Sequence, residues 1–97
     1  MTETTFRDQL ARDGFTEVLV RDWAAGQQLA EHSHPFDARL LVLAGDMQLT
    51  RSAGPERFSV GDSCEVPRGQ PHAEHYGPQG AQLLVGRRYS AAQPANA

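Results

Sequence analysis

Apolar positions along most of the chain form short runs separated by glycine and proline, a pattern that predicts a protein built of β-strands. We expect strands at residues 16–23, 27–34, 57–60, 63–66, 72–76 and 81–89, with two more apolar runs inside 38–52. Ala44-Gly45-Asp46 divides those two runs in the manner of a hairpin turn. Seven or eight short strands at this spacing are typical of an all-β sandwich or barrel.

The two ends of the chain differ from this pattern. Phe6 and Leu10 stand four residues apart among polar neighbours, which predicts a short helical turn closed by Gly14. Residues 90–97 are small, polar and interrupted by proline, which is typical of a flexible tail. The predicted organisation is an N-terminal helical or extended segment at 1–14, a β-barrel at 15–89 and a tail at 90–97.

Two of the predicted strands are apolar on both faces, at residues 40–43 (LLVL) and 83–85 (LLV). A strand that is apolar on both faces needs to be covered on both sides. Since the outer face of a small barrel normally meets water, a second copy of the chain is the simplest cover, and we expect a homodimer. The alternative is that the N-terminal helix lies over one of these strands.

Length, charge and cysteine content narrow the possible functions. The 97 residues suffice for one domain, and the nine basic residues, all arginine, are outnumbered by twelve acidic ones, for a net charge of −3. This balance argues against nucleic acid as the main partner. No apolar stretch approaches the ~20 residues needed to cross a bilayer, and the first residues lack a signal-peptide pattern. With Cys64 as its single cysteine, the chain is expected to lie in the cytoplasm.

Histidines provide the candidate chemistry. On a strand, residues i and i+2 point to the same face, so the side chains of His32 and His34 project together. His72 lies on a later predicted strand, and it would join them if the two strands are neighbours in a barrel. Three neutral imidazoles suit zinc, iron, nickel or copper and leave coordination positions open for water or substrate.

The spacing around these histidines resembles the two motifs of the cupin superfamily, G-x5-H-x-H-x3,4-E-x6-G and G-x5-P-x-G-x2-H-x3-N. The matching positions are Gly26, His32, His34 and Gly45 in the first motif and Gly61, Pro67, Gly69 and His72 in the second. The resemblance implies a small cupin β-barrel, a double-stranded β-helix or jelly roll, with a metal held inside by both motifs.

The chain departs from the cupin pattern at Ala38, where a glutamate ligand is expected, and at Tyr76, where asparagine is expected. Three alternatives stay open. The site holds a metal with three histidines alone, or a nearby carboxylate replaces the glutamate, or the metal is lost and the cavity takes an organic ligand. Glu74 shares strand parity with His72, and Asp37 adjoins Ala38; either is a candidate fourth ligand, and Glu74 could instead orient a histidine.

The resemblance implies one divalent transition metal (iron, zinc, nickel or manganese) and a small-molecule ligand. Tyr76 has inward parity and is a candidate for contact with that ligand. Because the cupin fold serves many activities, two functions remain: a metal-dependent oxygenase or isomerase of a small molecule, or a non-catalytic ligand-binding or sensor domain.

Overall fold

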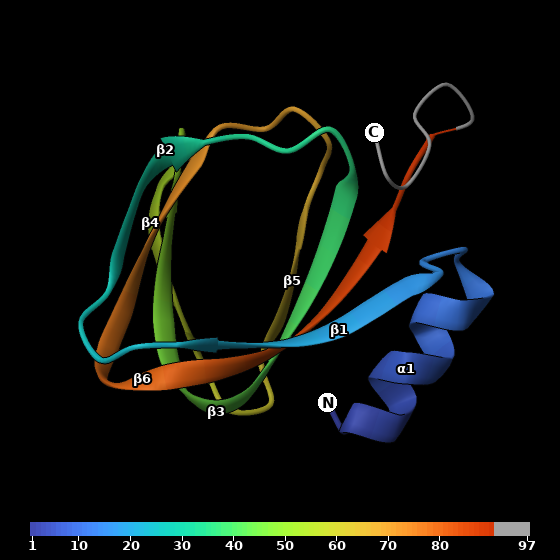
Figure 1. Cartoon of the computed structure of the whole chain (residues 1–97), viewed down its shortest axis with the longest axis horizontal. Helices are drawn as coiled ribbons and strands as arrows, with labels where there is room; N and C mark the ends of the chain where they lie inside the picture. The colour runs from blue at the N-terminus through green and yellow to red at the C-terminus, as the bar shows by residue number, and fades with distance from the viewer. Residues whose placement is uncertain (91–97) are drawn as a thin grey trace.

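The computed structural model describes residues 1–90 and consists of one helix and six strands (Figure 1). Their bounds are α1 Glu3–Arg12, β1 Glu17–Trp23, β2 Gln28–His32, β3 Asp37–Arg51, β4 Gly54–Ser59, β5 Ser63–Val66 and β6 His72–Arg88. Most of the predicted tail, residues 91–97, lies outside the described part. Among the described residues, no helix combines the length and apolar character that a membrane span requires.

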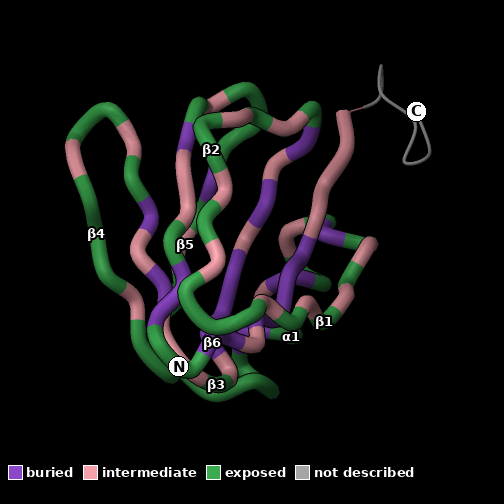
Figure 2. The backbone as a smooth tube through the Cα atoms, turned by 60° about the vertical axis from the view of Figure 1, so that its left-hand side comes forward, coloured by how far each residue is buried: buried purple, intermediate pink, exposed green. Residues whose placement is uncertain are grey.

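All strands belong to one antiparallel sheet that curves around an interior, with α1 lying outside it (Figure 1). The sheet order is β1-β6-β3-β4, and β2 adds to β6 while β5 adds to β3. The prediction of an all-β fold with a short N-terminal helix is confirmed. β4 is mostly exposed to solvent, whereas β3 and β6 carry most of the buried positions (Figure 2).

The prediction of a hairpin at Gly45, and of a strand end at Gly77-Pro78, is wrong. β3 and β6 each run through these positions and bend together, pairing on both sides of the bend, with Gly45 opposite Ala81. Gly45 has φ +72°, and a side chain there would overlap the backbone of Gly80. A glycine that allows two backbones to approach closely bends a strand as readily as it ends one, so the sequence signal is the same for both.

Helix α1 forms because its ends are capped and one face is apolar. The side chain of Thr2 accepts a hydrogen bond from the Thr5 backbone N–H. At the other end, Gly14 follows the C-cap residue Asp13 and has φ +81°. Phe6 and Leu10, spaced by one turn, are both buried, as the sequence pattern predicts. The helix begins at Glu3 and ends at Arg12.

The helix covers the outer face of the two long strands. Leu41 of β3 and Leu84 of β6 point outward and are buried with Phe6, Leu10 and Phe15 in a cluster of their own. Their strand neighbours point inward to the barrel core. Helix α1 therefore covers the outer face of these doubly apolar strands within a single chain. This is the alternative to cover by a second copy. The homodimer stays a prediction.

Candidate metal centre

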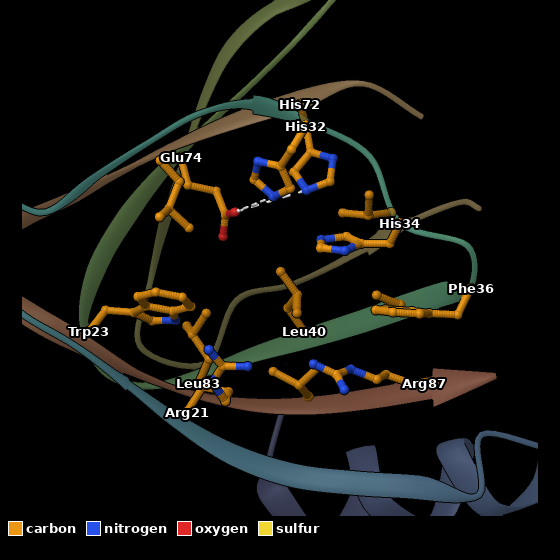
Figure 3. A pocket seen from close by; sticks show the side chains of 14 residues that line it. Arg21, Trp23, His32, His34, Phe36, Leu40, His72, Glu74, Leu83 and Arg87 are labelled. Carbon is orange, nitrogen blue, oxygen red and sulfur yellow. Dashed lines mark ion pairs between the residues drawn. The ribbon is translucent and has the colours of Figure 1, made fainter. Parts of the chain in front are cut away.

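His32, His34 and His72 meet at one side of the barrel interior (Figure 3). His32 ends β2 and is the register partner of His72, which begins β6, while His34 lies in the loop after β2. One ring nitrogen of each histidine lies within 4.8 Å of those of the other two. Nitrogens bound to one metal at about 2.1 Å lie roughly 3 to 3.5 Å apart, so a modest rotation of the rings closes the triad on an ion.

Backbone hydrogen bonds set the tautomers of two of these histidines. Nδ1 of His32 lies 2.7 Å from the carbonyl oxygen of Ala30, and Nδ1 of His72 lies 2.9 Å from that of Gln70. A carbonyl oxygen only accepts hydrogen bonds, so Nδ1 carries the proton in each ring. The Nε2 lone pairs are then free, which is the arrangement that orients histidines as metal ligands.

Glu74 places a carboxylate beside the same nitrogens. Its Oε2 lies 3.2 Å from His32 Nε2 and 3.9 Å from His72 Nε2, and its side chain is 9% exposed. Two lone pairs and a carboxylate oxygen that converge in a nearly buried site repel one another unless a proton or a metal ion lies between them. The donor set therefore fits a divalent metal, with Glu74 within reach as a fourth ligand.

The environment of His34 acts on the charge of its ring. Burial lowers the pKa of His34 below its ordinary value of 6.5, and the neighbouring His32 and His72 lower it further. Its ring also stacks on Phe36 at a centroid distance of 4.8 Å. A lowered pKa keeps the imidazole neutral at pH 7, the form that binds metals.

The other candidate residues differ in whether they line the cavity beside the triad. Ala38 faces the cavity, as the motif alignment requires, but offers only a methyl group. Asp37 does not line the cavity, since it accepts a hydrogen bond from the Arg68 backbone N–H and pairs with Arg88 at 3.0 Å. Tyr76 is buried behind Glu74, to which its hydroxyl donates a hydrogen bond of 2.5 Å, and it does not line the cavity either.

A cavity of about 120 Å³ opens next to the histidines. Its walls are mostly apolar, but they also include Arg21 and Trp23 of β1 and Arg87 of β6, which the sequence reasoning did not assign to the site (Figure 3). Arg21 and Trp23 share the strand parity of the half-buried Leu19. An arginine at inward parity is a signal that could have placed Arg21 in the interior.

Comparison by sequence gave no match, either to a family model or to a curated protein. Solved structures, in contrast, match in large number. A cupin superfamily protein from Desulfitobacterium hafniense aligns with a TM-score of 0.64 and 19% identity, over 77% of this chain and 80% of that one. A double-stranded β-helix protein from Klebsiella pneumoniae aligns with a TM-score of 0.66 and 23% identity, over 78% and 69% of the two chains.

A third similar structure is the DMSP lyase DddQ from Ruegeria pomeroyi. It aligns with a TM-score of 0.70 and 27% identity, over 79% of this chain but only 40% of that one. These likenesses agree on architecture while sequence identity is low, and they bear out the fold that the histidine and glycine spacing implied. The chain therefore has the cupin fold, a double-stranded β-helix.

Proposed function

We propose that this protein is a metal-dependent cupin that acts on a small molecule held in the barrel cavity. The observation that carries the proposal is the convergence of three histidine nitrogens, two of them with tautomers set by backbone carbonyls, on the wall of an apolar cavity. Three protein nitrogens leave coordination positions for a substrate, which is the arrangement of catalytic and not of structural metal sites.

Glu74 serves in this proposal as the carboxylate that the cupin pattern places at residue 38. It comes from β6 instead of β3, but its Oε2 reaches the Nε2 atoms of His32 and His72. A carboxylate in this position offsets the charge of a divalent ion. The geometry favours it over Asp37, whose carboxylate is occupied by Arg68 and Arg88.

The reaction class is inferred from the metal that the triad would hold and from the residues that line the cavity. A divalent metal bound by the triad supplies Lewis acidity to a small molecule, and iron adds oxygen chemistry. Glu74 is the single carboxylate among the cavity-lining residues of the described chain, so in a site where it does not bind the metal it is the candidate to hold or move a proton. We propose an oxygenase or isomerase of a small molecule, and the likeness to a DMSP lyase adds elimination to the reactions worth testing.

A non-catalytic binding or sensor domain is the second candidate. The cavity, at about 120 Å³, is smaller than the roughly 300–1,000 Å³ of pockets for drug-sized ligands. Metal or ligand binding without turnover would fit such a compact barrel. An enzyme and a sensor would both need the histidine triad to hold a metal.

The first experiment measures metal content. Protein purified without a histidine tag, and variants carrying His32→Ala, His34→Ala or His72→Ala, are analysed by elemental mass spectrometry. We expect about one equivalent of a transition metal in the wild type and its loss in each variant. The matched control is His75→Ala, because His75 is exposed and lies outside the triad. Uptake that is absent in the wild type, or equal in all variants, would contradict the proposal.

The second experiment separates enzyme from sensor. The metal-loaded protein is incubated with a panel of small acids, ketones and DMSP, and oxygen uptake and product formation are followed. Turnover that His72→Ala abolishes supports the enzyme. Binding of a panel member without turnover supports the sensor.

A further inference from the structure

Two buried N–H groups in the cavity wall have no acceptor within the described part of the chain. They are Nε1 of Trp23 on β1 and Nε of Arg87 on β6. Buried donors are almost always satisfied in folded proteins, because an unpaired one loses its bonds to water without replacement. Both residues line the same cavity, so a ligand in that cavity is a natural source of the missing acceptor.

Arg21 adds a third donor group to the wall of this cavity. It lies two residues before Trp23 on the same face of β1, with its guanidinium carbon 4.9 Å from the centre of the indole ring. Across residues 1–90, no carboxylate lies within ion-pair distance of Arg21. Figure 3 shows Arg21 and Arg87 on the side of the cavity opposite the histidines.

The charges of the cavity are separated between its two ends. Glu74 is turned toward the histidines, and across residues 1–90 its carboxylate forms no ion pair with Arg21 or Arg87. Arg87 does have a partner, since it donates to Glu17 at 2.8 Å, but its Nε remains unpaired. Arg21 therefore leaves this end with an uncompensated positive charge, and a small anion is the ligand that it would attract.

The wall between the two ends is apolar, formed by residues such as Leu40, Leu83 and Val85. A ligand that pairs with the unpaired donors and also contacts the apolar wall thus combines a planar acceptor group with a short apolar body. A carboxylate matches guanidinium groups particularly well, because its two oxygens accept parallel hydrogen bonds from them. The cavity volume of about 120 Å³ restricts the body to a few carbon atoms.

We propose that the cavity binds a short-chain carboxylic acid, with its carboxylate held by Arg21, Arg87 and the indole N–H of Trp23. The apolar body of the acid then extends toward the histidines. This inference deepens the proposed function by naming its substrate class, and it rests on that function only for which end of the acid reacts. The carboxylate site itself consists of side chains that need no metal.

The test uses the single tryptophan of the chain as its reporter. Nitrogen-15-labelled protein gives one indole N–H resonance, which is followed by NMR during titration with butyrate, in metal-free and in zinc-loaded protein. Butyramide, of the same size but neutral, is the ligand control. We expect a saturable shift with butyrate, and an affinity at least about tenfold lower for butyramide and in the variants Arg21→Gln and Arg87→Gln.

The variant control is Arg7→Gln, because Arg7 is exposed on α1 and does not line the cavity. The proposal is overturned if butyrate gives no saturable shift in either metal state, or if both cavity arginine variants bind it like the wild type. A shift that depends on zinc and not on the arginines also overturns it, since the metal would then hold the anion. Zinc binding is measured on the same samples. If the wild type binds butyrate but no zinc, the metal proposal is rejected and the carboxylate proposal stands.

Discussion

The hydroxyl of Tyr76 donates a hydrogen bond of 2.5 Å to Oε1 of Glu74, two residues earlier on the same face of β6. The other oxygen of that carboxylate faces the histidines. Burial raises the pKa of Tyr76, and the hydrogen bond to Glu74 raises it further, so the hydroxyl stays protonated. Tyr76 stands where the cupin motif has asparagine. This departure from the motif therefore positions the carboxylate that can stand in for the glutamate missing at Ala38.

Replacing Tyr76 by phenylalanine should weaken metal binding by about tenfold or more, because residues that orient metal ligands have effects of this size. Phenylalanine keeps the ring that stacks on Trp23 at 5.1 Å and removes only the hydroxyl. Zinc affinity, measured by competition with a chelator, provides the readout. Tyr89→Phe is the control, since Tyr89 packs against Phe36 and not against Glu74. Equal zinc affinity in the wild type and Tyr76→Phe would show that Glu74 does not depend on this bond.

Gly45→Ala should destabilise the protein by about 3 kcal/mol or more, because the new methyl group would overlap the Gly80 backbone in the paired bend. Gly26→Ala should cost only about 1 kcal/mol, since Gly26 also has positive φ but a methyl group there would meet no other atom within 4 Å. Urea unfolding of both variants gives the comparison. A similar loss at both sites would mean that backbone conformation alone matters and that β3 and β6 do not approach closely here.

Leu10→Ala should lower the free energy of unfolding by about 2–5 kcal/mol, because Leu10 is fully buried between α1 and the outer face of the sheet. Metal content should not change, since the histidines lie on the inner side. Val60→Ala is the control: Val60 is 63% exposed, and its truncation should cost less than about 0.5 kcal/mol. If Leu10→Ala were as mild as Val60→Ala, helix α1 would not cover this face in solution.

The pair of Asp37 and Arg88 should contribute stability that depends on pH. The backbone N–H of Arg68 and the side chain of Arg88 hold the pKa of Asp37 below its ordinary value of 3.8. A carboxylate whose pKa is lowered by folding stabilises the protein above its unfolded pKa, and this stability is lost as pH falls through the folded value. The wild type should thus be more stable than Asp37→Asn at neutral pH. The difference should shrink below about pH 3.8, as measured by urea unfolding across the acid range. A difference that persists unchanged would attribute it to packing.

Much of the fold was predictable from local pattern. The i, i+4 spacing of Phe6 and Leu10 predicts the helix, and glycine and proline spacing predicts the β-fold. The interpretation of Gly45 as a hairpin failed because a glycine at a bend and a glycine at a turn have the same local sequence. The apolar strand at residues 40–43 shows a related limit, although the homodimer itself stays a prediction. A face that is apolar must be covered, but strand composition does not say by which segment, and here α1 covers it.

The sequence by itself determined which side chains can hold a metal, since His32, His34 and His72 stand at motif spacing and strand parity limits where they point. Only the tertiary structure decided what surrounds them. Pairing of β1 with β6 joins segments some 60 residues apart, and it places Arg21 and Arg87 in the lining of one cavity. Strand parity tells inside from outside but carries no information about which inward side chains meet. That choice depends on register and sheet curvature, which arise from contacts along the whole barrel.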